Sequence, residues 1–565
     1  MCVCACMCVC VCVKRRQMAT VSISDRVTDT ASERKFTSWL VTNLSANFFM
    51  TSRPMKVVTL CVLSMALVGS AAGYLQPTDR SYKILVLIPK TSTSHRNVFM
   101  PLVEALADRG HKIVILASLP PVSKHPNVTE INHGIPKPYI NLFVEGKSLG
   151  GLLAMGNDIS ALARDLYQIP SVKQLYEKRK EFDLILVDNM MNEAVYPFVH
   201  EIPFITVAAP GMDHRQSAVL GNVLNPSYAP HLIGSFPLPL SLWQRIKNAF
   251  MHIYVPLLWR NWAIVPLIQK EISAQFPDLP PLLDIERNQS LTLMNTHFSI
   301  TTPVPLLPSQ VEVGAIHCRP GKPLPQDLEL WLTGAGSMGV IYFSLGSILR
   351  GEIMPPEYLQ VFLEAFRRLP QRVLWKYEGE LEGASDNVKV SSWLPQQDIL
   401  AHHNVKVFIS HGGLLSLQES IFHEKPLLVL PVFGDQPRNG MVVKNSDIGR
   451  VLVWEKLTAD RIVDALTDII SNQKYKENVA RMSASLRDQP TTPQERAVFW
   501  TEYVIRHRGA PQLRCPAAQL SWVEFLMLDV VGLLLLALLL LLLLIRRLLR
   551  TVSAALLGGI PKKND

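Results

Sequence analysis

The chain has 565 residues, of which 48% are hydrophobic and 18% charged, and its formal net charge is +9. This length allows two domains with a large core and a membrane segment, while the absence of a long basic stripe with interleaved aromatic residues excludes a nucleic-acid binder. Six of the nine cysteines lie in the first 12 residues, and only Cys318 and Cys515 lie in the body of the chain, which excludes a disulfide scaffold.

Two segments at the amino end are expected to lie outside the folded body. Residues 1–54 open with an alternating Cys-Val run, which a dinucleotide repeat read as coding sequence would give, so we interpret them as a non-native or disordered extension. A soft-metal site in the cysteines is the alternative. A lysine after Met55, a short apolar core and the small residues "SAAG" predict a secretory signal peptide over 55–73, with translation starting at Met55.

Alternating short apolar runs and longer amphipathic stretches predict a first α/β domain over 74–315 with a parallel sheet. A helix is predicted over 96–109, because Phe99, Leu102, Val103 and Leu106 fall on one face. Residues 221–282 are rich in proline and aromatic residues without clear periodicity, and the proline-dense residues 301–326 are typical of an inter-domain connection. The predicted strands are 83–88, 112–117, 183–187 and 203–209.

A second strand–helix series predicts another α/β domain over 316–520, so we expect two doubly wound domains with a cleft between them. Its predicted elements are a helix near 356–369 and strands at 340–343, 372–377, 388–391, 405–409 and 426–430.

The carboxyl end of the chain carries a membrane segment. Residues 525–545 contain a single charge, Asp529, and at a rise of about 1.5 Å per residue they span roughly 31 Å, enough for a transmembrane helix. Arginines follow at once, which predicts a cytosolic tail over 546–565 and a lumenal body. The ending "KKND" resembles the dilysine signal of type I membrane proteins of the endoplasmic reticulum, the alternative being a merely basic tail. The sequons at Asn127 and Asn288 are compatible with a lumenal glycoprotein.

Polar residues of the second domain follow its predicted strands, where open α/β sheets bind ligands. Gly412-Gly413 lets the backbone approach an oxyanion, and the helix that starts there offers N–H groups and a positive dipole end. His411, Ser344 and Ser347 can donate to the same anion, which suits a diphosphate.

The remaining polar residues suit the other parts of a nucleotide-sugar. Glu419 can accept hydrogen bonds from ribose hydroxyls, Trp393 can stack on a base, and Asp435 and Gln436 suit sugar hydroxyls. Taken singly, these residues are as compatible with a turn, a helix terminus or core packing. Their joint spacing predicts a nucleotide-sugar site.

The stretch "SWLPQQDILAHHNVKVFISHGGLLSLQESIFHEKPLLVLPVFGDQ" strongly resembles the signature of the UDP-glycosyltransferases, a membrane-bound family that conjugates small lipophilic molecules in detoxification. The resemblance continues through "VIYFSLGS", "VEVGAIHCRPGKPLP" and "DVVGLLLL" and covers about 74–565. It implies the GT-B fold, two Rossmann-like domains facing a cleft. It also implies that the uracil is held by Trp393 and Gln396, the diphosphate by Ser347 and His411, the ribose by Glu419, and the sugar by Asp435 and Gln436.

One position departs from the mammalian pattern. Mammalian glucuronosyltransferases carry Asn two residues after the glycine pair, where this chain has Leu415 followed by Ser416. "HGGLLS" looks more like the invertebrate members, which mostly use UDP-glucose. The resemblance therefore implies glucose as the transferred sugar, with glucuronic acid as the alternative.

The resemblance also implies the catalytic pair. Members that use a base place a His after the first strand, the position of His95 here, and Asp188 after "DLILV" matches the partner carboxylate. A helix N-terminus disfavours imidazolium, so we expect His95 to be neutral and Asp188 to fix its tautomer; the alternative for His95 is a capping or solvated loop residue. The implied reaction is an inverting displacement of UDP, with no metal expected because no Asp-x-Asp pair lies near the donor site.

The acceptor is expected in the loops near 91–95, 189–192 and 221–260, where apolar residues such as Met190, Met191, Trp243 and Phe250 also suit core packing or a membrane surface. A sphingolipid or sterol glycosyltransferase stays open, as does a homo-oligomer. A non-enzymatic lumenal lipophile-binding homologue predicts loss of His95 or Asp188, and both are present. A Rossmann dehydrogenase is excluded, because residues 89–95 lack a Gly-x-Gly-x-x-Gly turn.

Overall fold

The computed structural model describes residues 80–136, 149–191, 193–211 and 214–557, together with Leu75 and Thr78. These residues belong to one compact unit that spans Leu75–Asp565. The expected extension over 1–54, the signal peptide over 55–73 and the "KKND" ending lie outside the described residues.

Seven parallel strands form the first sheet, in the order β3-β2-β1-β4-β5-β6-β7. The four strands predicted in this region are confirmed to within one residue at each end. The proline-dense stretch over 301–326 contains the edge strand β7, so its interpretation as a plain inter-domain connection is wrong for that part. The strands are β1 (Lys83–Ile88), β2 (Lys112–Ala117), β3 (Val128–Asn132), β4 (Leu184–Asp188), β5 (Phe204–Ala208), β6 (Leu291–Met294) and β7 (Gln310–Glu312).

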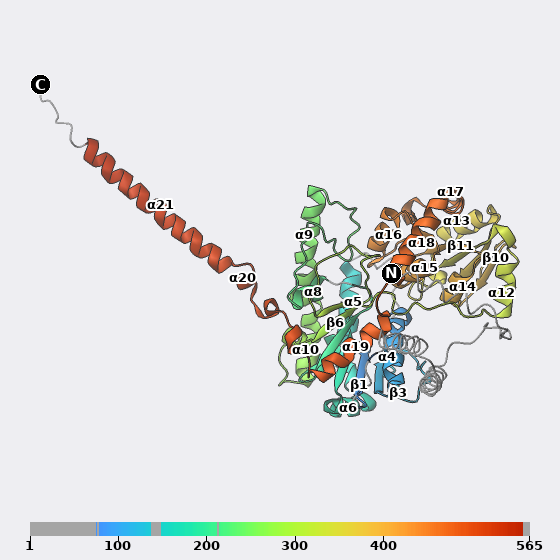
Figure 1. Ribbon diagram of the computed structural model, residues 1–565, viewed down its shortest axis with the longest axis horizontal. Coiled ribbons are helices and arrows are strands. Elements are labelled where there is room, and N and C mark those ends of the chain that lie inside the picture. Colours follow the sequence, from blue (N-terminus) through green and yellow to red (C-terminus); the bar gives the residue numbers. More distant parts are fainter. Residues whose placement is uncertain are drawn as a thin grey trace, which may run out of the picture. The chain divides into compact units, whose positions relative to one another are not determined.

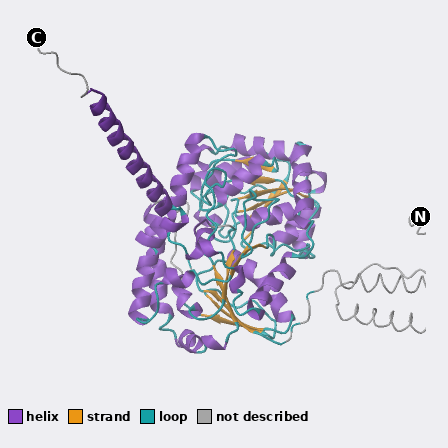
Figure 2. Ribbon diagram, turned by 60° about the vertical axis from the view of Figure 1, so that its left-hand side comes forward, coloured by secondary structure: helices purple, strands orange, loops and turns teal. Residues whose placement is uncertain are grey.

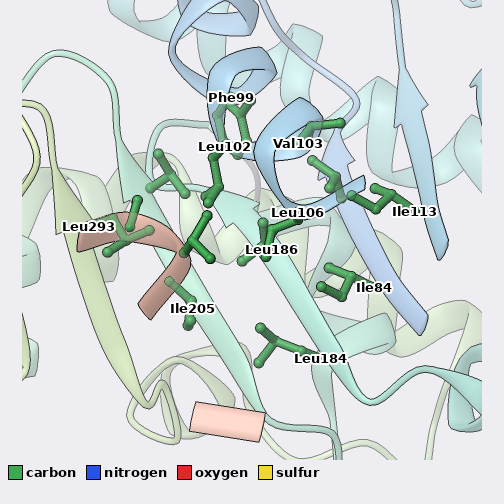
Figure 3. Packing of buried hydrophobic residues seen from close by; sticks show 14 of the residues in the cluster. Ile84, Phe99, Leu102, Val103, Leu106, Ile113, Leu184, Leu186, Ile205 and Leu293 are labelled. Atoms are coloured by element: carbon green, nitrogen blue, oxygen red, sulfur yellow. The ribbon is translucent and has the colours of Figure 1, made fainter. Parts of the chain in front are cut away.

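Helix α4 shows how the first sheet is covered. Its four predicted apolar residues are buried against Ile84, Leu184, Leu186, Ile205 and Leu293 of the strands (Figure 3). Two further helices, α9 and α10, lie in the stretch over 221–282 that showed no clear periodicity, and α11 starts at its last residue. The helices are α4 (Thr93–Asp108), α5 (Leu149–Leu166), α6 (Pro170–Glu177), α7 (Tyr196–Val199), α8 (His214–Val219), α9 (Leu242–Leu257), α10 (Val265–Gln275) and α11 (Leu282–Glu286).

Six parallel strands form the second sheet, in the order β10-β9-β8-β11-β12-β13. The five strands predicted here are also confirmed to within one residue. The strands are β8 (Val340–Ser344), β9 (Arg372–Lys376), β10 (Val388–Ser391), β11 (Val405–Ser410), β12 (Leu427–Val429) and β13 (Gly449–Val451). The helices are α12 (Gln326–Thr333), α13 (Pro356–Arg367), α14 (Gln396–Ala401), α15 (Leu414–Phe422), α16 (Gln436–Asn445), α17 (Ala459–Ser471) and α18 (Gln473–Arg487).

After the second sheet the chain returns to the first domain. Helix α19 (Pro493–Arg506) packs on α4, and its Ala497 and Val504 join the core of the first sheet. Glu502 accepts hydrogen bonds from Arg109 Nε at 2.5 Å and from Arg109 Nη2 at 3.0 Å. The sequence boundary assigned this helix to the domain over 316–520, whereas its contacts are with the first sheet.

A short helix, α20 (Trp522–Phe525), leads to the long helix α21 (Leu528–Leu557); both are labelled in Figure 1, and Figure 2 shows the long helix from another side. Within the described part of the chain, Leu528–Leu556 is the one helix long and apolar enough to cross a membrane, with a mean hydropathy of 3.1 and no buried residues. The predicted span over 525–545 therefore has a matching helix, which starts three residues later.

The order of the strands indicates where ligands bind. The first sheet grows outward in both directions from the pair β1 and β4, and the second from the pair β8 and β11. In doubly wound sheets the crevice for a ligand lies at the carboxyl ends of such a pair, because the connections on its two sides run over opposite faces of the sheet. The candidate site is therefore sought after these four strands.

Candidate functional site

His95 and Asp188 meet beyond the central strands of the first sheet. His95 lies in the first turn of α4, whose N-cap Ser92 accepts a hydrogen bond from the His95 backbone N–H at 3.2 Å. Asp188 ends β4, and its Oδ2 lies 2.9 Å from His95 Nδ1. The carboxylate is fully buried, whereas the imidazole is 21% exposed, so a buried acid orients a ring that solvent reaches.

His411 lies beyond the central strands of the second sheet and is held between two glycines. A Cβ atom on Gly346 would stand 2.6 Å from the His411 ring, and one on Gly413 would also stand 2.6 Å from it. Burial lowers the pKa of His411 to about 4, with a smaller contribution from the Lys376 cation, so the ring is neutral. Its Nδ1 and the Oγ of Ser347 are buried without a hydrogen-bond partner in the described part of the chain.

The turn between β11 and α15 has two glycines, so a ligand can come close to its backbone. Gly412 has a φ of +83°, which favours glycine, and a Cβ there would stand 2.7 Å from Val429 Cγ1. Gly413 is the N-cap of α15 and brings no side chain to bond the first turn. The first turn of α15 therefore has no side-chain cap and begins next to the His411 ring, an arrangement that suits an anion. Ser344, in contrast, is buried and accepts from the Gly346 N–H at 3.2 Å, which holds the turn after β8.

Gln396 and Glu419, which were expected to hold different parts of the nucleotide, are in direct contact with each other. Gln396 Nε2 donates to Glu419 Oε2 at 2.5 Å and to Ser416 Oγ at 3.1 Å. Tyr342 donates to Gln396 Oε1 at 3.2 Å, and His317 Nε2 lies 3.6 Å from Glu419 Oε1. Burial raises the pKa of Glu419 to about 7 and lowers the pKa of His317 to about 4. Tyr342 and His317 were not predicted; a strand position and a loop carry no local signal for this contact.

Trp393 lies in the loop between β10 and α14 and is 61% exposed. The Lys376 ammonium lies 5.7 Å from the centroid of its ring, within range of a cation–π contact. An exposed indole beside the other predicted site residues is suited to stack on a planar ring, which core packing of this tryptophan would have prevented.

Asp435 and Gln436 lie at the start of helix α16, and their side chains have different hydrogen-bond partners. Gln436 Oε1 accepts from the backbone N–H groups of Val432 at 2.8 Å and Phe433 at 3.1 Å, so its carbonyl shapes the preceding loop. Asn439 Nδ2 donates to Asp435 Oδ2 at 2.7 Å and to the carbonyl of Gly412 at 2.9 Å, linking α16 to the glycine turn. Asn439 was not predicted, although its spacing of four from Asp435 on one helix was a usable signal.

Asp435 of the second domain lies close enough to His95 of the first domain to interact with it electrostatically. Burial raises the pKa of Asp435, and this rise is opposed by its hydrogen bond from Asn439 and by the nearby His95. Asp435 belongs to the second domain and His95 to the first. The two groups therefore act on each other across the junction of the domains.

A cavity of about 340 Å³ lies beside this junction. Its lining is mainly apolar and comes from the start of α8, the loop after α8 and the loop after β6, with Glu312 of β7 and, from the second domain, Arg438 of α16. Trp243 and Phe250, which were expected to suit the acceptor, core packing or a membrane surface, do not line it; they are exposed on α9. The main lining residues are His214, Leu224, Ala229, Phe298, Val304 and Arg438.

Comparison with known proteins gives consistent results. Residues 156–563 match the UDP-glucuronosyl and UDP-glucosyl transferase family. A protein named UDP-glycosyltransferase UGT5 from Dactylopius coccus is 34% identical, the match covering 80% of this chain and 89% of that protein. A protein named UDP-glucosyltransferase 2 from the same species is 34% identical over 82% of this chain and 91% of its own. The crystal structure of the calicheamicin glycosyltransferase CalG4 covers 76% of this chain and 100% of its own, with a TM-score of 0.51 and 16% identity, a likeness of fold.

Proposed function

The chain belongs to the UDP-glucuronosyl and UDP-glucosyl transferase family and has its GT-B fold, and on that premise we propose that it transfers glucose from UDP-glucose to a hydroxyl group of a small lipophilic acceptor. As a member of this family it is a UDP-sugar glycosyltransferase. The sugar, the acceptor and the residue roles below are the proposal, and the geometry of the site supports them.

His95 is the proposed general base. With Nδ1 donating to the buried Asp188 carboxylate, the lone pair lies on Nε2, which takes the proton of the acceptor hydroxyl. The acceptor oxygen forms its bond to the anomeric carbon while the bond from that carbon to the phosphate oxygen breaks, and the configuration inverts. The Asp188 carboxylate stabilises the imidazolium as it forms and keeps the ring in the productive tautomer.

The leaving UDP is stabilised by the rim of the second domain. The N–H groups at the start of α15, the Ser347 hydroxyl and the His411 ring meet the diphosphate. The proposal assigns Trp393 and Gln396 to the uracil and Glu419 to the ribose. Asp435 and the amide nitrogen of Gln436 hold the sugar hydroxyls. The proposed reaction uses no metal ion.

The preference for glucose is proposed from the residues after the glycine pair. Leu415 occupies the position where the mammalian glucuronosyltransferases carry Asn, and the neighbouring Ser416 accepts from Gln396. The relative named UDP-glucosyltransferase 2 supports the same choice. UDP-glucuronate is the competing donor in the assay below.

The single observation that carries the proposal is the His95–Asp188 pair beside the anion rim. The test is an incubation of microsomes containing the full chain with UDP-glucose, UDP-glucuronate and a panel of phenols, sterols and ceramide. We expect hexosyl conjugates from UDP-glucose and a phenol or sterol, and a rate lower by about a hundredfold or more from the His95→Ala chain. Turnover only with UDP-glucuronate would contradict glucose as the transferred sugar, and turnover only with ceramide would contradict a small lipophilic acceptor. Full turnover by the His95→Ala chain would contradict His95 as the general base.

We also propose residence in the membrane of the endoplasmic reticulum, with the body lumenal and the tail cytosolic. The helix α21 followed by Arg546 and Arg547 supports this orientation. Protease added to sealed microsomes should remove a tag at the carboxyl end and spare the body. Digestion of the body instead would reverse the orientation.

A further inference from the structure

Helix α9 carries its apolar side outward, the reverse of an ordinary surface helix. At about 100° per residue, its large exposed apolar residues fall within an arc of roughly 120° around the helix. Phe250 is 61% exposed, and Phe250 and Tyr254 stack with ring centroids 5.1 Å apart. The outward residues are Leu242, Trp243, Ile246, Phe250, Ile253, Tyr254 and Leu257, all exposed.

The opposite side of α9 is polar and holds the helix to the body. Asn248, the one fully buried residue of α9, donates to the carbonyls of Pro226 at 2.7 Å and Ala229 at 2.9 Å, and it accepts from the His231 N–H at 2.8 Å. His252, one turn later, lies 3.1 Å from the Ala229 carbonyl. Because these hydrogen bonds fix the rotation of the helix, the apolar arc cannot turn inward without breaking them.

The chain segment that contains this arc carries cations and no acids. The sequence from His214 to Lys270 contains no Asp or Glu, while Arg245 and Lys247 lie on α9 itself. The Lys247 ammonium lies 5.7 Å from the ring centroid of Trp243. Tryptophan, tyrosine and cations around an apolar face are the composition of helices that lie in the interface of a lipid bilayer.

The chain itself brings a bilayer close to α9. A Cβ on Gly221 would stand 2.8 Å from the Ala518 backbone nitrogen, so the segment that leads to α21 packs against the loop before α9. From Ala518 to Leu528, where α21 begins, there are ten residues, which reach at most about 36 Å. Gly221 is in turn five residues from Pro226, whose carbonyl Asn248 binds.

We propose that the apolar arc of α9 docks on the surface of the bilayer that α21 enters, so that the first domain touches the membrane at a second place. The occupant is the lipid interface, with anionic headgroups beside Lys247, which lies next to the arc, whereas Arg245 lies outside it. Tethering by α21 raises the local concentration of this face at the membrane, so that a modest interfacial affinity is enough.

A photocrosslinking scan of the full chain in microsomes tests this docking. The photoreactive residue p-benzoylphenylalanine is placed at Ile246, Phe250 or Ile253, and lipid adducts are quantified by mass spectrometry. Leu330 of α12, which is 65% exposed in the second domain, is the control at matched exposure, and Arg245 is the control on the same helix. Each variant is first shown to resist limited proteolysis as the unsubstituted chain does.

We expect lipid adducts at the three arc positions to exceed those at Leu330 and Arg245 at least tenfold. Equal labelling at all five positions would overturn the proposal. Adducts of Phe250 mainly with another copy of the chain would also overturn it and would identify the arc as a self-association surface. The scan measures no turnover, so its outcome is independent of the proposed reaction.

Discussion

The two domains contribute to the candidate site in contrasting ways. In the second domain almost every polar group is fixed in advance: two glycines hold His411, Asn439 links Asp435 to the glycine turn, and Gln396 is bonded to Glu419. In the first domain the fixed part is one pair, His95 with Asp188, and the largely apolar cavity is lined by other residues. Under the proposed function, this contrast describes a donor side built for one ligand and an acceptor side that places the base and leaves the shape of the acceptor open.

The largest expected effect tests the fixed part of the acceptor side. His95→Ala should lower kcat by about 10²- to 10⁴-fold, because the general base is lost. Asp188→Asn should lower kcat by a similar factor through the wrong ring tautomer. Steady-state kinetics with UDP-glucose measures both.

Donor binding provides the control for this comparison. The Kd of UDP-glucose should stay within about twofold in both variants, since neither residue is assigned to the donor. If donor affinity fell together with kcat, the His95–Asp188 pair would also contribute to donor binding, and the contrast between the donor side and the acceptor side would not hold.

The donor side should be intolerant of a single methyl group. In Gly413→Ala the new Cβ would stand 2.6 Å from His411 Nε2 and displace the ring. Overpacking of this kind costs about 1–3 kcal/mol, so UDP affinity, measured by calorimetry, should fall about 10- to 100-fold. Gly440→Ala in α16 is the matched control, because its Cβ would meet no atom closer than 3.6 Å. Equal affinities of the two variants would mean that the position of His411 is not used for binding.

Glu419 predicts a pH dependence that is confined to the donor side. Burial raises its pKa to about 7, whereas a ribose hydroxyl is best accepted by the ionised carboxylate. The affinity for UDP-glucose should therefore rise about tenfold from pH 6 to pH 8. In Glu419→Gln this rise should be absent, and a rise of unchanged size there would assign it to another group.

The same raised pKa has a consequence for stability. Glu419 is protonated more readily in the folded, empty protein than in the unfolded chain, so its contribution to stability is present below its unfolded pKa and is lost as the pH rises through about 7. Denaturant titration of the unliganded protein at pH 6 and 8 should show this loss in the unsubstituted chain and a smaller one in Glu419→Gln.

The donor side could be predicted from the sequence because it is local. Buried parallel strands are continuous apolar runs, so β8 to β12 were located within a residue, and the polar residues after them fell at the rim. Four strands gave no long apolar run and were missed: β3 and β7 at the edges of the first sheet, β6 beside β7, and β13 at the edge of the second sheet. Tyr342 and His317 were missed because their contacts with Gln396 and Glu419 join distant segments.

The acceptor side was less predictable for a physical reason. His95 and Asp188 are 93 residues apart and were assigned only by resemblance, although both follow strands that the apolar pattern located. Trp243 and Phe250 were expected to suit the acceptor, core packing or a membrane surface, because composition alone does not reveal which face of a helix is buried. The hydrogen bonds of Asn248 and His252 decide this, and a polar inner face reverses the usual interpretation of an amphipathic helix.

The smallest expected effect joins the acceptor side to the membrane. Ala229, whose carbonyl both Asn248 and His252 bind, also lines the cavity, so a docked α9 would place the cavity beside the lipid in which a lipophilic acceptor dissolves. Replacing Ile246, Phe250 and Ile253 by Gln should raise the KM of a membrane-partitioning sterol about three- to tenfold, because the acceptor must then enter from water at a lower concentration. The KM of a water-soluble phenol and the Kd of UDP-glucose should not change. If the KM of the sterol and the KM of the phenol rose equally, the substitutions would act by disturbing the first domain. The proposed link between the bilayer and the cavity would then be contradicted.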